Sequence, residues 1–337
     1  MRGLALGALA LIVFYVVGES SVRLFDVVDR LNGFPRRLYI VDVDEPRYRL
    51  RPGLDEVARG VRVRTNRQGF RGREVKDVPE LGRERILVLG DSVAFGYRLE
   101  EEQAFPVLLE QELAKRSPAP VEVLNAGVEG YNTRAELALL RKNGFRLQPR
   151  TVIVLFNLND FDDTPSLGAR GVLMQGPPAS RCSLWLAEHS ELYLLLDALV
   201  RRRAAIFLSA GSDGSGYSDL DRFVSALRKQ VWREPDDGRL DTMVDSLRAL
   251  RDETAARGIR LVFVIVPDGD QVGTDEADLS PQKRLGVLCE EEGLDCLDLR
   301  GAFEAMAAEP LFFDIMHPNA AGHGILAVEV AAHLIKN

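Results

Sequence analysis

Three residues of this chain have the types that nucleophilic catalysis requires: Ser92, Asp314 and His317. A serine hydroxyl is a poor nucleophile until a base removes its proton. His317 can take that proton, because an unperturbed imidazole has a pKa of about 6.5 and exchanges protons near neutral pH. Asp314 precedes His317 by three residues and can hold the other ring nitrogen, which fixes the tautomer and stabilises the imidazolium.

The elements that would position these residues are indicated by apolar runs that alternate with helical patterns. We expect strands at 85–90, 121–125, 151–156, 259–266 and 294–299, and helices at 103–116, 133–144, 238–257, 280–292 and 319–335. This alternation predicts right-handed βαβ units and a parallel sheet of about five strands covered on both faces, which is a three-layer α/β/α sandwich.

Polar residues stand where the first three of these strands end, and ligands of such sheets bind at the carboxyl ends of the strands. The residues are Gly90, Asp91 and Ser92 after the first strand, Asn125 and Gly127 at the second, and Asn157, Asn159 and Asp160 after the third. Asp314 and His317 follow the fifth strand and can therefore reach the same edge of the sheet.

These motifs resemble those of the SGNH (GDSL) hydrolase family. The first block of the family, G-D-S-x-x-x-G, is matched from Gly90 to Gly96, and the glycine of the second block by Gly127. The last block, D-x-x-H, is matched by Asp314 and His317. The third block, G-x-N-D, is matched by Asn159 and Asp160 but has Asn157 in place of its glycine. The resemblance covers about residues 84–335.

The resemblance implies an SGNH-hydrolase or flavodoxin-like fold and ester cleavage through an acyl-serine intermediate, with Ser92, Asp314 and His317 as catalytic residues. It also implies an oxyanion hole built from the backbone N–H groups of Ser92 and Gly127 and the side-chain amide of Asn159. Removing one such donor typically costs about 2.7–4 kcal/mol of activation free energy. A glycine at 127 allows the backbone to approach the substrate closely. No cofactor and no metal are expected.

The sequence lacks the motifs that other catalytic mechanisms would require. No G-x-S-x-G elbow follows a predicted strand, and the H-E-x-x-H, G-x-x-x-x-G-K-[ST] and G-x-G-x-x-G motifs do not occur in a suitable context. Asp160, Asp162 and Asp163 lie close together but lack the full pattern of a calcium loop. We expect Asp91 to stabilise the turn before Ser92. His189 could touch substrate, and the remaining histidines, His323 and His333, are expected to be structural.

The composition excludes some classes of partner. A net charge of −8 argues against nucleic acid, because neutralising phosphates requires clustered Lys and Arg. The one dense basic run, 201–203, is expected to be a solvated helix end. Three cysteines provide no disulfide framework. Cys289 and Cys296 could pair in an oxidising compartment or remain two buried thiols.

The N-terminus predicts export from the cytoplasm. The uncharged segment Leu4–Gly18 spans about 22 Å as a helix, somewhat less than the roughly 30 Å hydrocarbon core, and extension through Val22 would complete a span. We therefore expect residues 1–22 to be a single-pass anchor in the cytoplasmic membrane, with a cleaved signal peptide as the alternative. Both hypotheses place the remaining chain outside the cytoplasm.

The rest of the chain divides by composition. Residues 23–83 are expected to form a small β-rich appendage, since 60–64 alternates Val and Arg at the period of a half-exposed strand. Residues 84–337 form the predicted hydrolase domain, with a long insertion at about 161–237. This insertion could be a lid or substrate-binding element, and its apolar stretch at 184–200 could line an acyl site or simply pack as core.

Proteins that resemble this one, with an N-terminal anchor and an extra region before the first block, often act on acylated glycans. The expected substrate is therefore an acetyl or short acyl ester of a cell-envelope polysaccharide. An acyltransferase that moves the acyl group to a polysaccharide, and a lipid or thioester esterase, are alternatives. A hypothesis of another class is a non-catalytic assembly subunit of an envelope complex, although the Ser92, Asp314 and His317 set argues against it.

Overall fold

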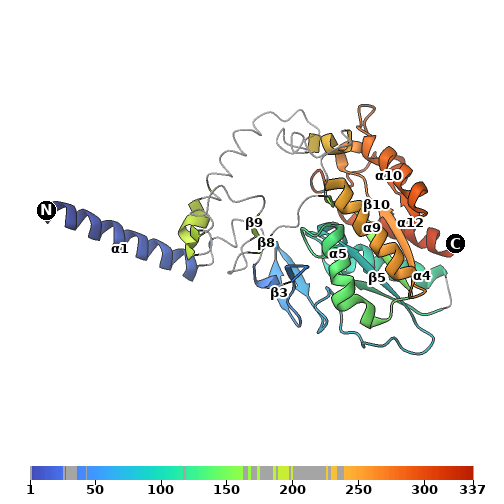
Figure 1. Cartoon of the computed structure of the whole chain (residues 1–337), viewed down its shortest axis with the longest axis horizontal. Coiled ribbons are helices and arrows are strands. Elements are labelled where there is room, and N and C mark those ends of the chain that lie inside the picture. The colour runs from blue at the N-terminus through green and yellow to red at the C-terminus, as the bar shows by residue number, and fades with distance from the viewer. Residues whose placement is uncertain are drawn as a thin grey trace.

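The centre of the protein is a five-stranded parallel sheet with the strand order β11-β10-β7-β5-β6 (Figure 1). The computed structural model describes residues 2–25, 27, 36–42, 44–116, 119–161, 166–167, 173–174, 185–186, 189–196, 199, 225–226, 229–233 and 239–336. The strands of the sheet are β5 (Glu84–Gly90), β6 (Val121–Asn125), β7 (Thr151–Phe156), β10 (Arg260–Ile265) and β11 (Asp295–Asp298). The predicted parallel sheet is confirmed, with all four strand pairings parallel.

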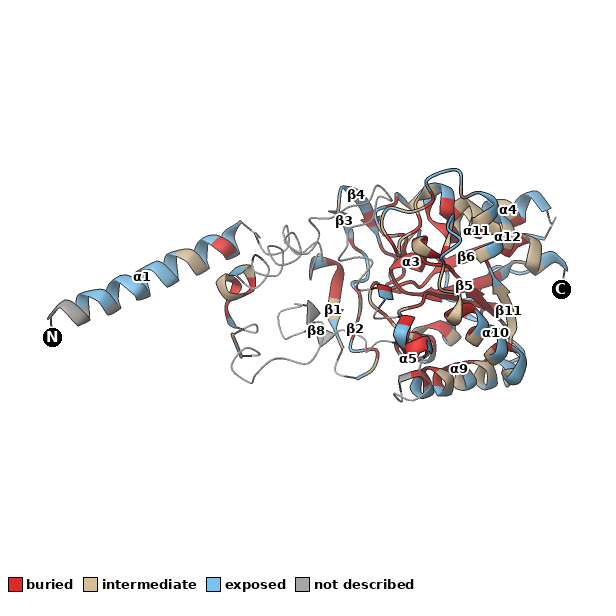
Figure 2. Cartoon of the chain, turned by 90° about the horizontal axis from the view of Figure 1, so that it is seen from above, coloured by how far each residue is buried: buried red, intermediate tan, exposed pale blue. Residues whose placement is uncertain are grey.

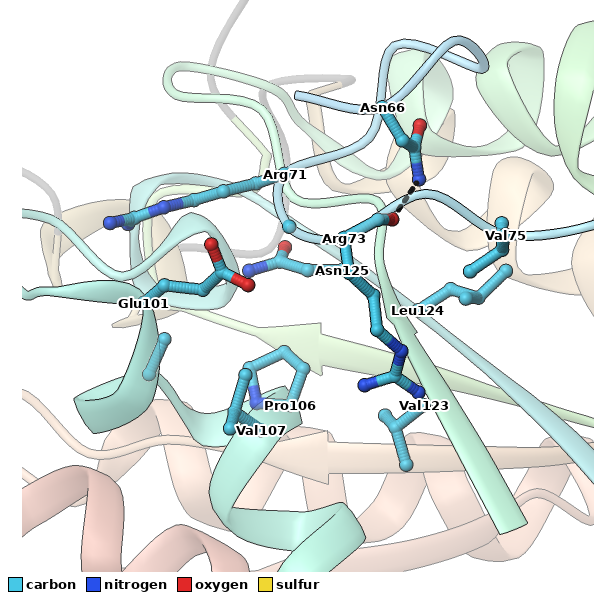
Figure 3. Close-up of a pocket in the computed structure, with 12 residues that line it drawn as sticks. Asn66, Arg71, Arg73, Val75, Glu101, Pro106, Val107, Val123, Leu124 and Asn125 are labelled. Atoms are coloured by element: carbon cyan, nitrogen blue, oxygen red, sulfur yellow. Dashed lines mark hydrogen bonds between the residues drawn. The ribbon is translucent and has the colours of Figure 1, made fainter. Parts of the chain in front are cut away.

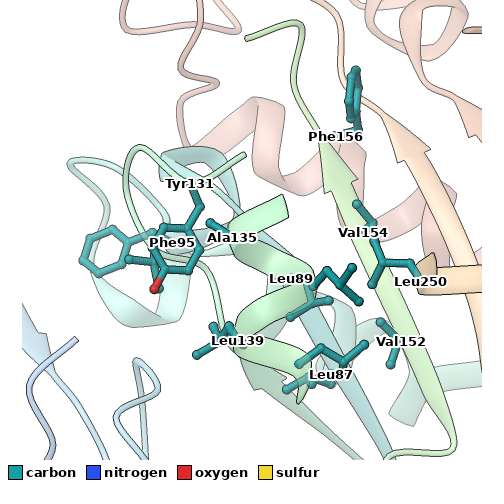
Figure 4. Close-up of a cluster of buried hydrophobic side chains, with 14 of the residues drawn as sticks. Leu87, Leu89, Phe95, Tyr131, Ala135, Leu139, Val152, Val154, Phe156 and Leu250 are labelled. Atoms are coloured by element: carbon teal, nitrogen blue, oxygen red, sulfur yellow. The ribbon is translucent and has the colours of Figure 1, made fainter. Parts of the chain in front are cut away.

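Helices cover both faces of this sheet, because successive side chains of each strand point to opposite faces. The helices of the α/β region are α3 (Ser92–Phe95), α4 (Phe105–Arg116), α5 (Thr133–Leu139), α9 (Arg239–Ala255), α10 (Ser280–Glu292), α11 (Arg300–Ala305) and α12 (Ala320–Lys336). Leu87 and Val152 pack toward α5 and α9 in one core cluster (Figure 4), and Val88 and Ile153 pack toward α4 and α12 in the other. The result is the predicted three-layer sandwich.

Short helical turns occur in the appendage and in the α/β region. They are η1 (Arg36–Leu38), η2 (Glu101–Gln103), η3 (Leu140–Gly144), η4 (Phe145–Leu147) and η5 (Gly269–Gln271). The helix predicted at 133–144 is α-helical only to Leu139 and continues as a π-helical turn through Gly144.

The appendage forms two antiparallel hairpins, and the strand expected at 60–64 is one of their strands. They pair β1 (Tyr39–Val41) with β2 (Tyr48–Leu50), and β3 (Asp55–Ala58) with β4 (Val61–Arg64). Tyr48, Leu50 and Phe70 are almost fully buried and belong to the same core cluster as Leu87 of the central sheet. The burial colours of Figure 2 show buried residues extending from the sheet into these hairpins. The appendage therefore shares its hydrophobic core with the α/β region.

The N-terminal residues form the helix α1 (Arg2–Leu24), which projects from the rest of the molecule (Figure 1). Within the part of the chain that the structure describes, no helix is long and apolar enough to cross a membrane, and the predicted span is not confirmed. The uncharged segment Leu4–Gly18, at about 22 Å, falls short of the hydrocarbon thickness.

Most of the predicted insertion at 161–237 lies outside the described residues, and so does the basic run 201–203. The described strands of the insertion are β8 (Ser166–Leu167) and β9 (Leu173–Met174). In the helical segment 191–196, Leu194 packs on Val22 of α1, and the Glu19 carboxylate accepts hydrogen bonds from the backbone N–H groups at its start. This part of the stretch 184–200 forms a small core with α1.

Candidate active site

Ser92 follows the carboxyl end of β5, the strand between β7 and β6, on a sharp turn into α3. Gly90 ends the strand with φ +150°, and a Cβ there would approach Ala94 Cβ to 2.6 Å, so the turn requires glycine. The Asp91 carboxylate caps α3 by accepting a hydrogen bond from the Val93 backbone N–H at 2.8 Å. The structural role expected of Asp91 is therefore confirmed, and the turn presents Ser92 at the start of the helix.

Asp314 and His317 lie in the loop between α11 and α12, beside Ser92. The Ser92 Oγ and His317 Nε2 atoms are 2.9 Å apart, and His317 Nδ1 lies 2.8 Å from both carboxylate oxygens of Asp314. Asp314 Oδ1 also accepts the backbone N–H groups of Met316 and His317, at 3.0 and 2.9 Å. The structure thus brings together all three residues that the sequence singled out.

The electrostatic environment keeps the Asp314 carboxylate ionised. Burial raises its pKa, but the hydrogen bonds from His317 and from two backbone N–H groups, together with the histidine charge, outweigh burial and place the pKa below its ordinary value of 3.8. A charged carboxylate at neutral pH can stabilise an imidazolium that forms on His317.

The three expected oxyanion donors lie around α3 but differ in availability. The Gly127 N–H donates to Asn125 Oδ1 at 3.0 Å, so it is already engaged within its own loop. Asn159 Nδ2 lies 3.4 Å from Asp91 Oδ2, which leaves its second N–H available. Gly127 also packs tightly against the helix of Ser92, because a Cβ at this position would lie 2.3 Å from the Phe95 nitrogen.

Several residues near the site were not found by sequence reasoning. The Tyr97 ring stacks on His317 with centroids 4.0 Å apart, and the Arg59 guanidinium lies 4.7 Å from the centroid of Tyr97. Glu129 pairs with Arg59 and follows Gly127 by two residues. Arg71 is buried against the loop after α3. Their sequence context offered no signal, since each depends on a contact between distant segments.

Two hollows lie near these residues. An open groove of about 490 Å³ lies between the segment that follows Tyr97 and the residues that flank the loop of Asp314 and His317. It is lined by Arg98, Leu99, Gln103, Phe313, Asn319, Ala320 and Ala321. A cavity of about 20 Å³, large enough for about one water molecule, lies between the appendage and the end of β6 (Figure 3). The stick view shows Arg71 and Asn125 bordering this cavity, whose lining includes none of Ser92, Asp314 and His317. Of the two, only the groove has a volume that could admit more than a water molecule.

The remaining candidates have structural partners. His323 is fully buried, its Nδ1 accepts the Phe105 backbone N–H at 2.9 Å, and burial lowers its pKa to about 3. His333 Nε2 lies 2.6 Å from Asp295, and His189 stacks on Trp185 beside α1. Asp160 accepts the Asn157 backbone N–H in a local turn.

Among the residues that the structure describes, no group of three His, Cys, Asp or Glu side chains could hold a metal ion. Asp162 and Asp163 lie outside the described residues. Cys289 and Cys296 form a disulfide between α10 and β11, which settles the alternative that the sequence left open.

A serine at the end of a central parallel strand, with a histidine and a carboxylate in reach, is the architecture of a serine hydrolase. Residues 88–325 match the GDSL-like Lipase/Acylhydrolase family. The match covers more than half of the chain, so the protein belongs to this family of hydrolases, as the motifs indicated. No curated protein matches the chain.

Solved structures similar to this one include three esterases or lipolytic proteins. An acetylxylan esterase, Axe2 from Geobacillus stearothermophilus, is 16% identical with a TM-score of 0.45, covering 74% of this chain and 94% of that one. A putative lipolytic protein of the G-D-S-L family from Desulfitobacterium hafniense is 12% identical, with a TM-score of 0.43 and coverages of 74% and 98%.

The third is a two-domain esterase (CEX) active on acetylated mannans. It is 15% identical with a TM-score of 0.44, over 75% of this chain and 49% of that one. The present chain therefore spans about half the length of that esterase.

Proposed function

We propose that this protein is a serine ester hydrolase in which Ser92 is the nucleophile, His317 the general base and Asp314 the residue that orients the imidazole. The observation that supports this most is the chain of contacts from Ser92 Oγ to His317 Nε2 and from His317 Nδ1 to Asp314. A nucleophile within hydrogen-bond reach of a base, with the base held by a third group, is the arrangement that acyl transfer requires.

The proposed reaction has two half-reactions. Ser92 Oγ attacks the ester carbonyl carbon while its proton passes to His317 Nε2, and the imidazolium then returns that proton to the departing alcohol. A water molecule next gives a proton to His317 and attacks the acyl carbon. The imidazolium then passes this proton to the departing Ser92 Oγ, which releases the carboxylic acid and restores the Ser92 hydroxyl. Asp314 stays ionised throughout and stabilises the imidazolium in both steps.

The negative charge of the tetrahedral intermediate requires hydrogen-bond donors. We assign them to the Ser92 backbone N–H and to the side-chain amide of Asn159, whose Nδ2 lies 3.4 Å from Asp91 Oδ2. The Gly127 N–H would join them only by exchanging its bond to Asn125 Oδ1 for the substrate oxygen.

The proposed substrate is an acetyl or other short acyl ester on a glycan of the cell envelope. The open groove beside Tyr97 supports this, because it combines polar side chains such as Gln103 and Arg98 with the half-exposed Phe313 ring, a combination that suits a polar ligand with apolar faces. It lies beside the loop of His317, the residue that returns the proton to the leaving alcohol. The groove would therefore hold the alcohol part of the ester.

Hydrolysis is favoured over transfer to a sugar hydroxyl because water can reach the site. The Asp314 side chain is 35% exposed, whereas a transferase must exclude water from its acyl-enzyme. The acyltransferase and the lipid or thioester esterase remain the alternative functions, and an assembly role in an envelope complex is the non-enzymatic one.

We also propose that the protein acts outside the cytoplasm, with α1 serving in export or membrane attachment. The Cys289–Cys296 disulfide supports this location, since such bonds persist in oxidising compartments. Large apolar side chains along α1, including Leu11 and Phe14, are also exposed. Fractionating cells and treating spheroplasts with protease would test the proposal, and a protein protected inside spheroplasts would contradict it.

The enzymatic test compares wild type and Ser92→Ala in the hydrolysis of nitrophenyl acetate, butyrate and octanoate, and in acetate release from an acetylated glycan. We expect activity on the acetyl ester, a decline with chain length, and loss of activity in Ser92→Ala by at least about 1000-fold. A preference for octanoate would favour the lipid esterase. Acetyl transfer to an added glycan without acetate release would favour the transferase. Activity retained by Ser92→Ala would contradict the mechanism.

A further inference from the structure

The appendage reaches the catalytic centre through the loop that follows β6. This loop carries Gly127 and, two residues later, Glu129. Tyr39 donates its hydroxyl to Glu129 Oε2 at 2.6 Å, and Tyr48 donates to the Glu129 carbonyl oxygen at 2.6 Å. The side chain of Arg59 forms an ion pair with Glu129 Oε1. Three residues of the appendage therefore hold one residue of the loop.

Arg59 links this loop to the catalytic histidine. The Arg59 guanidinium lies over the Tyr97 ring, 4.7 Å from the ring centroid. The Tyr97 ring in turn stacks on the ring of His317. The same side chain is paired with Glu129. A single arginine thus connects the loop of Gly127 with the ring that contacts His317.

Arg59 lies in the turn of the β3–β4 hairpin, and from this turn its side chain contacts Glu129 and Tyr97. Arg59 and Gly60 form this two-residue turn, and both have positive φ values, 52° and 83°. Arg59 therefore occupies a backbone conformation that residues with a Cβ seldom adopt. The surrounding contacts must hold this turn in place.

The charges of Arg59 and Glu129 are paired with each other in a largely buried environment. The Arg59 side chain is 13% exposed and that of Glu129 only 5%. Burial lowers the pKa of Arg59, but the charge and hydrogen bond of Glu129 outweigh burial and raise it above its ordinary value. Removing either partner would leave a buried charge uncompensated, which is strongly destabilising locally.

A second arginine of the appendage, Arg71, contacts the segment that leads into Tyr97. Arg71, 3% exposed, donates from Nη1 to the carbonyl oxygens of Phe95 and Gly96, at 2.7 and 2.8 Å, and from Nη2 to that of Leu99. Phe95 ends α3, and Gly96 and Leu99 flank the loop residues Tyr97 and Arg98. Arg71 and Arg59 together fix the loop backbone and the Tyr97 ring.

We propose that the appendage is part of the catalytic apparatus and that Arg59 is a positioning residue for His317 and for the Gly127 loop. It acts through Tyr97 and Glu129 and does not touch the reacting atoms. This inference rests on the proposed esterase function and extends it, because it assigns to the appendage a role in the chemical step.

The test measures kcat and KM for nitrophenyl acetate in Arg59→Met, Arg59→Lys, Glu129→Gln and the Arg59→Met/Glu129→Gln double variant. The matched control is Arg62→Met, which removes another arginine of the same hairpin whose side chain pairs with the exposed Asp55. Circular dichroism and the thermal midpoint Tm establish that each variant is folded at the assay temperature.

We expect Arg59→Met to lower kcat by about 10- to 100-fold with little change in KM, because small misplacements of catalytic groups act mainly on the chemical step. Lysine retains the charge but cannot stack as a plane, so Arg59→Lys should recover part of the loss. The losses of the double variant should be less than multiplicative, since both single variants break one pair.

A purely structural role gives a different result. Arg59→Met would then lower Tm while its kcat at a temperature where it is folded equals that of Arg62→Met and wild type, and this outcome would overturn the inference. Failure of the proposed function is separate, since it would appear as activity retained in Ser92→Ala whatever the Arg59 variants do.

Discussion

The ring of Tyr97 lies almost parallel to the ring of His317, with centroids 4.0 Å apart and an interplanar angle of 23°. The contact fixes the plane in which the imidazole faces Ser92 and Asp314. It also places an aromatic face against the group that becomes positively charged when Ser92 loses its proton, and such faces attract cations.

Replacing Tyr97 should therefore lower kcat if the new side chain has no aromatic ring, and should leave kcat nearly unchanged if it has one. A cation–π contact of about 1 kcal/mol corresponds to a change of about 5-fold in rate. We expect Tyr97→Leu to lower kcat for nitrophenyl acetate by about that factor and Tyr97→Phe to stay close to wild type. Equal kcat values for all three proteins would show that the stack contributes nothing to catalysis.

Gly127 should tolerate no side chain. A Cβ there would lie 2.3 Å from the Phe95 nitrogen and 2.6 Å from the Ala94 carbonyl carbon, and both are backbone atoms that cannot move aside cheaply. Overpacking of this kind typically costs about 1–3 kcal/mol. Gly127→Ala should thus lower both Tm and activity, because the strain falls on the helix of Ser92.

The control for this variant is Gly301→Ala in α11, where a Cβ meets nothing within 4 Å. Alanine is a better helix former than glycine, so Gly301→Ala should leave Tm unchanged or raise it slightly. A Gly127→Ala protein as stable and active as Gly301→Ala would contradict the packing argument.

Much of the fold could be predicted from the sequence because its signals are local. Continuous apolar runs such as Thr151–Phe156 predict a central parallel strand, and this strand is buried throughout. Ser92, Asp314 and His317 were found because the polar residues follow such runs in a recognisable order. The oxyanion donors were predicted from the same blocks, but the bond between Gly127 and Asn125 depends on side-chain geometry that no motif encodes.

Contacts between distant segments could not be predicted in this way. Arg85 reads as the polar start of a strand, yet it is 1% exposed and pairs with Glu122, its neighbour across the β5–β6 register. Arg59, Arg71 and Glu129 belong to the same class. Each is a charged residue whose burial is decided by a partner far away in the chain, and hydropathy predicts such residues to be exposed.

Glu136 of α5 gives the protein a pH-dependent stability. It is fully buried, and neither carboxylate oxygen has a hydrogen-bond partner among the described residues. Burial, and then the charge of Asp91, raise the pKa of Glu136 well above its ordinary value of 4.5. The folded state therefore keeps a proton that the unfolded state releases once the pH exceeds about 4.5, so this residue reduces stability as the pH rises from there.

Glu136→Gln should remove that effect, since the amide mimics the protonated acid. We expect its Tm to exceed that of wild type at pH 8 and the difference to vanish as the pH falls toward 4.5, measured by thermal unfolding across this range. The exposed Glu102→Gln is the control and should follow wild type. A Tm difference that is the same at every pH would refute the protonation argument.

The disulfide predicts a defined thiol count. Unfolded but unreduced protein should show one reactive thiol, that of Cys182, and three after reduction. Closing the short loop between Cys289 and Cys296 should stabilise the fold by about 2 kcal/mol, so a reductant should lower Tm. A Cys289→Ala/Cys296→Ala variant should be insensitive to reductant, and three thiols without reductant would contradict the pairing.

The most direct test of the acyl-serine mechanism is to treat the protein with a nitrophenyl phosphonate and locate the adduct by peptide mass spectrometry. The reagent loses nitrophenolate when a serine oxygen attacks its phosphorus, and the product imitates the tetrahedral intermediate. The mechanism predicts one adduct per chain, on Ser92, which is absent in Ser92→Ala and forms far more slowly in His317→Gln. A folded wild-type protein that remains unlabelled, or that carries the adduct on another residue, would contradict it.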